Sequence, residues 1–121
     1  MHVLPLHHTH GIVNCLLCPL HIGATIVMLP NFDAKSVLQY LLNETNTNVN
    51  VFMAVPTIYA KLLEYINQQN CDNEEMKKIL KNNIRLMVSG SAALPQPLFE
   101  SWKCKTGHTL LERYGMTEIG N

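Results

Sequence analysis

The sequence has 121 residues, of which 47% are apolar and 15% are charged, and its nine basic side chains balance its nine acidic ones. A chain of this length can bury one modest core, and its zero net charge excludes a global field that would favour nucleic acid or an anionic membrane as partner. The share of charged residues is below the usual quarter, which indicates that part of the surface lies against another body.

The cysteines and the first residues of the chain bear on the cellular compartment of the protein. The four cysteines do not form the pattern of a small secreted disulfide scaffold, so we expect free thiols in a reducing compartment. They are Cys15, Cys18, Cys71 and Cys104. No basic segment followed by a cleavage site opens the chain, so no targeting signal is visible.

The N-terminal part predicts a strand over residues 2–6, a polar cluster from His7 to Gly11, an apolar helix over residues 12–21 and a β-branched strand over residues 24–29. The apolar stretch approaches the length of a membrane span. Polar residues and helix breakers interrupt it, which favours a buried helix followed by a buried strand over a span. They are Asn14, Pro19, His21 and Gly23.

The rest of the chain alternates helices and strands. Asp33 is predicted to cap a helix over residues 34–43, and Pro56 to open a second helix after a strand. Residues 67–73 are the most polar and predict an exposed loop. The further predicted elements are strands over 49–54, 84–88 and 109–111, helices over 74–82 and 95–105, and a small-residue turn over 89–93. This order, with continuous apolar strands, predicts an α/β fold with a mostly parallel sheet flanked by helices on both faces.

Three polar loops are predicted to leave strand ends, over residues 7–11, 89–93 and 113–120. Because the carboxyl ends of parallel strands share one edge of a sheet, these loops can converge on a ligand. The last loop combines Tyr114, Thr117 and Glu118, which supply an aromatic face for a base, a hydroxyl for a phosphate oxygen and a carboxylate for Mg²⁺. The alternative is that each loop is an ordinary turn.

Two other site types were weighed against a nucleotide site. Ser89-Gly90-Ser91 before a helix can cradle an anion, but it is not G-x-S-x-G, and no Asp–His pair supports a nucleophilic serine. A zinc site is the second rival, because C-x-x-C is a zinc spacing and three histidines lie nearby. These five residues are His8, His10, Cys15, Cys18 and His21. The cysteines lie in an apolar helical run, which favours buried thiols.

Three motifs in the same order resemble those of the adenylate-forming enzymes, the acyl-CoA synthetase and luciferase superfamily. They are L-P-L-H-H-T-H-G, G-S-A-A-L and Y-G-M-T-E. Within that superfamily, M-V-S-G-S-A-A-L-P with L-L-E-R-Y-G-M-T-E is most similar to the malonyl-CoA synthetases. Members of that superfamily usually have an aromatic residue where this chain has His7.

The resemblance implies roles for the motif residues. His8 would line the acyl pocket and act in catalysis, as would Thr117 at the α-phosphate and Glu118 at Mg²⁺. Tyr114 would stack on adenine. Further contacts to the nucleotide or the acyl group would come from Gly90, Ser91, Ala92, Ala93, Gly115 and Met116.

Arg113 carries a separate argument about the substrate. A guanidinium beside an acyl pocket is costly unless it meets an anion, and it binds a carboxylate well. A dicarboxylic acid such as malonate supplies a second carboxylate, with Ser91 as a hydroxyl partner. The alternative is an ion pair of Arg113 with Glu112 or Glu118.

The resemblance also implies a two-step reaction. A carboxylate attacks the α-phosphate of ATP to give an acyl-adenylate, and the thiolate of CoA then displaces AMP. A phosphate loop, a ribose-binding Asp and a C-terminal lid domain with a catalytic Lys would lie outside residues 1–121. We therefore expect the chain to be a fragment of the large N-terminal domain, inactive alone, from a protein of mitochondrial location. Alternatives are a non-catalytic truncated isoform, a small binding module, or a synthetase for methylmalonate or another acid.

Overall fold

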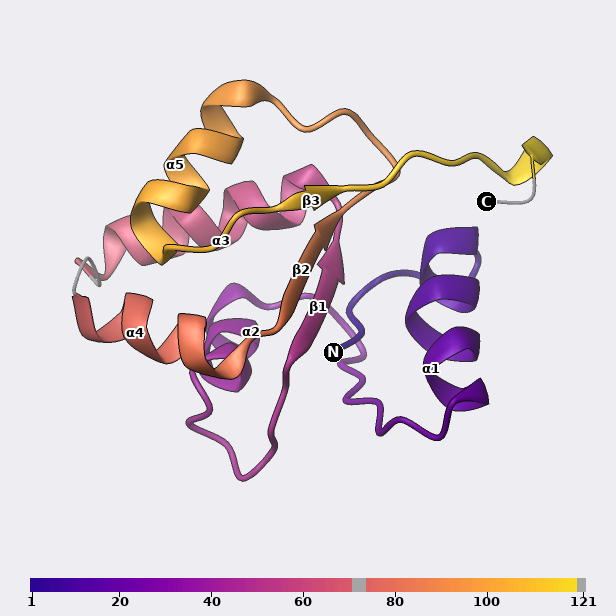
Figure 1. Ribbon diagram of the computed structural model, residues 1–121, viewed down its shortest axis with the longest axis horizontal. Helices are drawn as coiled ribbons and strands as arrows, with labels where there is room; N and C mark the ends of the chain where they lie inside the picture. Colours follow the sequence, from indigo (N-terminus) through magenta and orange to yellow (C-terminus); the bar gives the residue numbers. More distant parts are fainter. Residues whose placement is uncertain (71–73, 120–121) are drawn as a thin grey trace.

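The computed structural model describes residues 1–70 and 74–119 (Figure 1). Helices alternate with three short strands along most of the chain. In order the elements are η1 (His10–Leu17), α1 (Cys18–His21), α2 (Ala34–Leu41), β1 (Val51–Ala54), α3 (Pro56–Gln68), α4 (Glu74–Asn83), β2 (Leu86–Ser89), α5 (Gln96–Thr106), β3 (Leu111–Glu112) and η2 (Thr117–Ile119).

The strands form one parallel sheet in the order β1-β2-β3, which confirms the predicted α/β class. Val51 lies opposite Leu86, and Val88 lies opposite Leu111. Parallel neighbours need crossover connections, and α3 with α4 and then α5 supply them. In Figure 1 helices α2 to α5 lie mainly to the left of β1 and β2, and the N-terminal helix lies to the right.

The core is centred on three aromatic rings from β1, α3 and α5. The Tyr59 ring meets Phe52 at a centroid distance of 5.6 Å and Trp102 at 4.9 Å, both edge to face. All three side chains are buried. The Tyr59 hydroxyl donates to the Val88 carbonyl oxygen at 2.8 Å, so the rings join α3 to both the sheet and α5.

Most predicted helices are confirmed, with local reasons. Asp33 caps α2, because its carboxylate accepts from the Ser36 backbone N–H at 2.9 Å. Pro56 occupies the first turn of α3, where a missing N–H costs nothing. Helix α4 has acids in its first turn and a lysine in its last, as the helix dipole favours. The predicted loop over 67–73 overlaps the end of α3 and lies partly outside the described residues.

The two predicted N-terminal strands are wrong as strands. The structure has a single parallel bridge between His2 and Met28 there. Its hydrogen bonds run from His2 N–H to Val27 O at 2.8 Å and from Leu29 N–H to His2 O at 3.1 Å. Pro5 cannot donate to a ladder, and the chain turns there.

Two further elements differ from the prediction. The first helix begins at His10, not at residue 12, and its first eight residues wind as a π-helix, so Pro19 falls in the first turn of α1. The last strand, predicted as buried over 109–111, is Leu111–Glu112 and exposed, because it lies at the sheet edge. Within the described residues, no helix is long and apolar enough to cross a bilayer.

Candidate functional site

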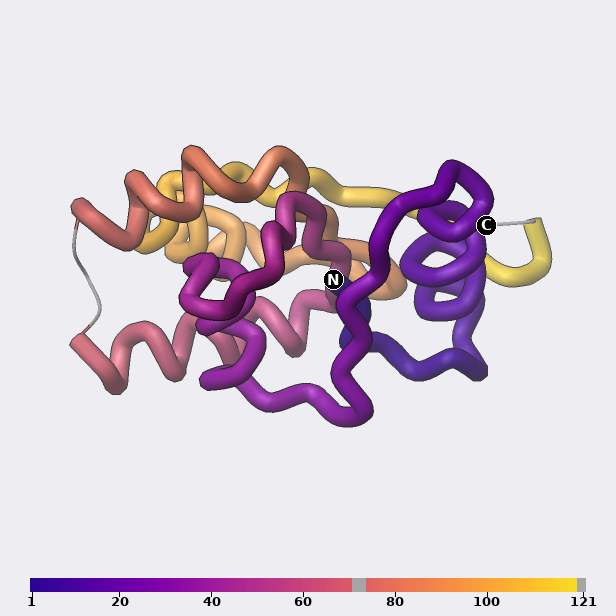
Figure 2. Tube along the Cα trace, turned by 90° about the horizontal axis from the view of Figure 1, so that it is seen from below, coloured from indigo at the N-terminus to yellow at the C-terminus, as the bar shows by residue number. Residues whose placement is uncertain are grey.

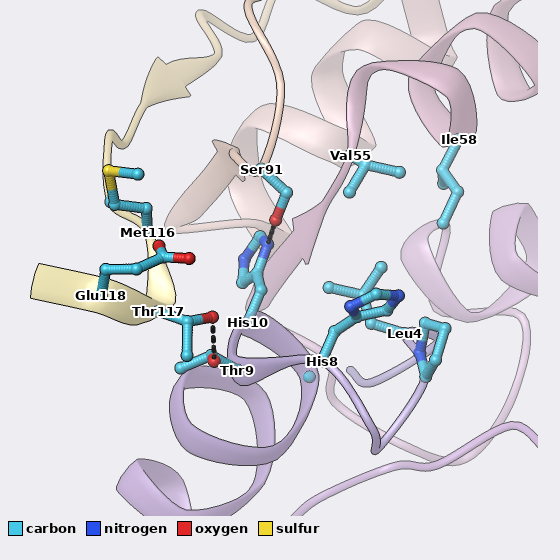
Figure 3. A pocket seen from close by; sticks show the side chains of 13 residues that line it. Leu4, His8, Thr9, His10, Val55, Ile58, Ser91, Met116, Thr117 and Glu118 are labelled. Atoms are coloured by element: carbon cyan, nitrogen blue, oxygen red, sulfur yellow. Dashed lines mark hydrogen bonds between the residues drawn. The ribbon is translucent and has the colours of Figure 1, made fainter. Parts of the chain in front are cut away.

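A cavity of about 600 Å³ opens at the carboxyl edge of the sheet (Figure 3). The segments after β1, β2 and β3 border it, together with the turn before η1. Six residues singled out from the sequence line it: His8, Ser91, Gly115, Met116, Thr117 and Glu118. The predicted convergence of the three loops therefore occurs.

The rest of the cavity lining comes from residues that were not individually predicted to contact the nucleotide or the acyl group. They are Leu4, Pro5, Thr9, His10, Gly11, Val55 and Ile58. Val55 follows the last residue of β1, so the strand-end rule applied to β1 would have found it. Figure 3 shows the His8 imidazole at the end of the cavity to which Leu4, Val55 and Ile58 also contribute, and these three side chains give that end an apolar lining.

The first and last loops meet through two hydroxyls. Thr9 Oγ1 and Thr117 Oγ1 lie 3.2 Å apart, within hydrogen-bonding distance, although 108 positions separate them in the chain. The Glu118 side chain stands beside Thr117 at the same rim of the cavity (Figure 3). The cavity therefore has a polar end with two hydroxyls and one carboxylate.

The first and second loops meet through His10 and Ser91. His10 Nδ1 lies 3.0 Å from Ser91 Oγ, and the His10 side chain is only 2% exposed. Burial, and next the neighbouring positive charge of Arg113, hold the pKa of His10 below its ordinary value. Ser91 has a φ of 68°, the left-handed region, which a non-glycine residue adopts only at a cost.

Gly90 is required by a close approach of two side chains. A Cβ atom at this position would lie 2.7 Å from Arg113 Cγ and 3.1 Å from His10 Cε1. The first of these distances is too short for any side chain to be accepted without movement of Arg113. Gly90 therefore leaves the space of its missing Cβ to the His10 ring and the Arg113 stem, which both pack there.

Two hydrogen bonds join the end of β3 and the residue after it to β2 and the loop that follows β2. The Arg113 N–H donates to the Ser89 carbonyl oxygen at 2.9 Å, and the Glu112 carboxylate accepts from the Leu94 N–H at 3.1 Å. The Arg113 side chain is half-buried against Gly90.

Five of the predicted site residues do not line the cavity: Gly90, Ala92, Ala93, Arg113 and Tyr114. Ala92 and Ala93 are exposed. Tyr114 is 87% exposed, and its hydroxyl donates to Met116 Sδ at 3.8 Å. Its ring is therefore accessible to a planar group beside the cavity.

The cysteines behave in two different ways. Cys15 is buried, as expected, and burial raises the pKa of its thiol to about 11. Cys18 is exposed, which corrects the prediction that both lie in the core; it follows the π-helical stretch and opens α1 on the outer side. Both are free thiols, as is Cys104, whereas Cys71 lies outside the described residues. In residues 1–70 and 74–119, no three His, Cys, Asp or Glu side chains gather closely enough to hold a metal ion.

The family model and the curated relatives that match this chain agree with one another. The family model described as AMP-binding enzyme matches residues 1–120. Malonate–CoA ligase ACSF3, mitochondrial, of Homo sapiens is 58% identical over 99% of this chain, and malonate–CoA ligase of Arabidopsis thaliana is 39% identical over 98%. The chain spans 21% of the length of each.

Solved structures agree with the sequence relatives. A malonyl-CoA ligase in a ternary product complex with methylmalonyl-CoA and AMP superposes with a TM-score of 0.78 at 37% identity, over 97% of this chain and 24% of that one. ATP-bound MatB from Rhodopseudomonas palustris gives a TM-score of 0.78 at 36% identity, over 97% and 21%. With the family model covering nearly every residue, this chain belongs to the AMP-binding enzyme family.

Proposed function

We propose that this chain forms part of the active site of an AMP-forming acid–thiol ligase that converts malonate, ATP and CoA into malonyl-CoA, AMP and pyrophosphate. The observation that carries the proposal is the shared cavity at the carboxyl edge of the sheet, bordered by the three loops that bear the motifs of the family. The 58% identity to a malonate–CoA ligase over 99% of the chain supports this substrate. Residues 1–121 would then be part of the large AMP-binding domain.

The reaction has two steps. A carboxylate oxygen of malonate forms a bond to the α-phosphorus of ATP as pyrophosphate leaves, and the CoA thiolate then attacks the acyl carbon as AMP leaves. Thr117, with Thr9 beside it, would hold an α-phosphate oxygen by its hydroxyl. The backbone of Gly90, Ser91, Ala92 and Ala93, with Gly115, would contact nucleotide and acyl group. The accessible ring of Tyr114 suits stacking on adenine.

The residues present fit magnesium bound with a nucleotide. Mg²⁺ is usually held by one or two carboxylates together with substrate phosphates. Glu118 supplies one carboxylate at the polar end of the cavity, next to Thr117. When bound, the ion would neutralise charge on the phosphates.

In this proposal, the residues that contact the acyl group determine which acid the enzyme accepts as substrate. We assign the acyl group to His8, which lies next to apolar side chains, and to Met116, with a hydroxyl offered by Ser91. Arg113 lies one residue beyond β3 and would bind the second carboxylate of a short dicarboxylic acid. The name of the human relative includes mitochondrial, and we extend that location to this protein.

A chimeric enzyme tests the function. This chain replaces the aligned segment of the human malonate–CoA ligase, and malonyl-CoA formation is measured with malonate, ATP and CoA. We expect activity within about tenfold of the parent, because the two segments are 58% identical. The matched control carries Glu118→Gln, which removes the metal-binding charge at nearly the same volume.

The control should lose most activity at low magnesium and regain part of it at high magnesium. A correctly folded chimera that forms no acyl-AMP from malonate, methylmalonate or butyrate would contradict the proposed function. Activity with butyrate but not with malonate would keep the reaction and overturn the substrate.

A further inference from the structure

His10 lies at the junction of the three loops and takes no part in the proposed reaction steps. Its ring is 2% exposed, its Nδ1 lies 3.0 Å from Ser91 Oγ, and its Cε1 packs against Gly90 (Figure 3). The Arg113 stem packs on the same glycine. The imidazole therefore contacts the loop that presents Ser91 and neighbours the residue proposed to bind the second carboxylate.

The direction of the His10–Ser91 hydrogen bond decides what Ser91 can offer the cavity. A hydroxyl has one hydrogen to donate and two lone pairs. If the imidazole accepts at Nδ1, the serine hydrogen is used and only lone pairs remain for a ligand. If the imidazole donates from Nδ1, the serine hydrogen is free to be donated to an anion.

The environment of the other ring nitrogen favours donation from Nδ1. His10 Nε2 is buried and has no hydrogen-bond partner within residues 1–70 and 74–119. In proteins, a buried N–H without an acceptor is rarer than a buried acceptor without a donor. Because burial and the Arg113 charge disfavour the imidazolium, the ring has one proton, and placing it on Nδ1 avoids the orphaned N–H.

We infer that His10 is a positioning residue whose neutral, Nδ1-protonated ring donates to Ser91 Oγ, so that the Ser91 hydroxyl hydrogen is presented to a carboxylate in the cavity. The same bond holds Ser91 in its left-handed backbone conformation. This inference deepens the proposed function and rests on it for the identity of the anion, the second carboxylate of a dicarboxylic acid. The tautomer itself stands on the geometry alone.

The tautomer is read directly from the chain by two-bond ¹H–¹⁵N correlation spectra of the protein labelled with ¹⁵N-histidine. The His10 signals are assigned by their loss in His10→Asn, with His21→Asn, at an exposed histidine, as the control. We expect the pattern of an Nδ1–H neutral ring at pH 7 to 8. An Nε2–H pattern for His10 would overturn the inference.

Two substitutions in the chimeric ligase test the consequence for the substrate. Asn places its amide nitrogen where His10 Nδ1 lies, whereas Gln places it near Nε2. His10→Asn should keep the preference for malonate over butyrate. His10→Gln should lower kcat/KM for malonate by about tenfold to a hundredfold, the usual worth of a hydrogen bond to a charged group, and leave butyrate little changed.

Other results of these two substitutions would contradict the positioning role of His10. Retained preference in His10→Gln, lost preference in His10→Asn, or equal losses on malonate and butyrate in both variants would each overturn the positioning role. If the unmodified chimera forms no acyl-CoA from any acid, the proposed function fails, and the tautomer measurement still decides the hydrogen-bond direction.

Discussion

Two regions of this molecule use their apolar residues differently. The body, residues 34–110, contains β1, β2 and α2 to α5, and the rim comprises residues 1–29 and 111–119. Within the described residues, every large hydrophobic side chain that is exposed belongs to the rim. They are Leu6, Ile12, Leu17, Leu20, Ile22, Met28, Leu111, Tyr114, Met116 and Ile119.

The difference separates stability from ligand contact. The body joins its elements through buried aromatic rings, and its interior accounts for most of the apolar burial. The rim supplies most of the cavity lining but packs less of itself. Substitutions in the body should therefore change the free energy of unfolding, and substitutions in the rim should change substrate use. Figure 2 shows the N-terminal helix at one end of the molecule, away from the packed helices of the body.

Trp102→Ala should have the largest effect on stability. Trp102 is 1% exposed and meets the Tyr59 ring edge to face. Emptying such a site costs about 3–5 kcal/mol through lost burial and a cavity. Urea unfolding of the chain measures the loss. The rim control, Ile22→Ala, removes a side chain that is 78% exposed and should change the free energy of unfolding by less than about 0.5 kcal/mol. Equal losses in the two variants would refute the division into body and rim.

The sequence predicted the body better than the rim, for a physical reason. Continuous apolar strands such as Val51–Ala54, and caps such as Asp33, are local signals that packing reinforces. The rim pairs residues distant in sequence, such as His2 with Met28, through a single bridge. No local pattern specifies that bridge, so the two strands predicted there were wrong.

In the candidate site, too, the contacts between residues distant in sequence could not be predicted. Chemistry-bearing residue types marked Thr117, Glu118 and Ser91, and these do border the cavity. His10 was considered only as a zinc ligand, because its partner Ser91 lies 81 positions away. Thr9 was missed for a similar reason, since its link to Thr117 spans 108 positions.

Arg113→Ala tests the rim at the substrate level, in the chimeric ligase. Losing a charge-assisted contact to the second carboxylate costs about 2–5 kcal/mol, which is about thirtyfold to several-thousandfold in kcat/KM for malonate. Butyrate, which lacks that carboxylate, should lose little. Tyr114→Ala is the comparison, because loss of adenine stacking should weaken all acids alike. Equal losses on malonate and butyrate in Arg113→Ala would show that Arg113 supports the loop instead.

Tyr59→Phe and Tyr114→Phe form a matched pair of hydroxyl deletions. The Tyr59 hydroxyl is buried and donates to Val88 O at 2.8 Å, whereas the exposed Tyr114 hydroxyl meets a sulfur at 3.8 Å. The first deletion should cost about 1–3 kcal/mol of unfolding free energy and the second close to nothing. Urea unfolding of both variants under one condition measures the pair. A larger loss from Tyr114→Phe would place the rim hydroxyl in the stabilising core.

A fall in pH should unfold the rim before the body, because three side chains have pKa values that are lowered in the folded protein. We expect this effect to be smaller than those of the substitutions above. Burial lowers the pKa values of His2 and His10, both in the rim, from an ordinary value of 6.5. Below that pH the unfolded state binds more protons at these rings than the folded state, so stability falls as pH drops from 6.5 through the lowered values. The Ser36 hydroxyl and N–H lower the pKa of Asp33 in the body from 3.8, so its contribution is lost only at more acidic pH. Hydrogen exchange by segment, corrected for intrinsic rates, should show residues 1–29 losing protection as the pH falls below 6.5 while α3 and α5 keep theirs. His10→Asn should reduce this acid sensitivity, since Asn does not titrate. Simultaneous loss in both regions at one pH would mean that rim and body unfold as a single cooperative unit.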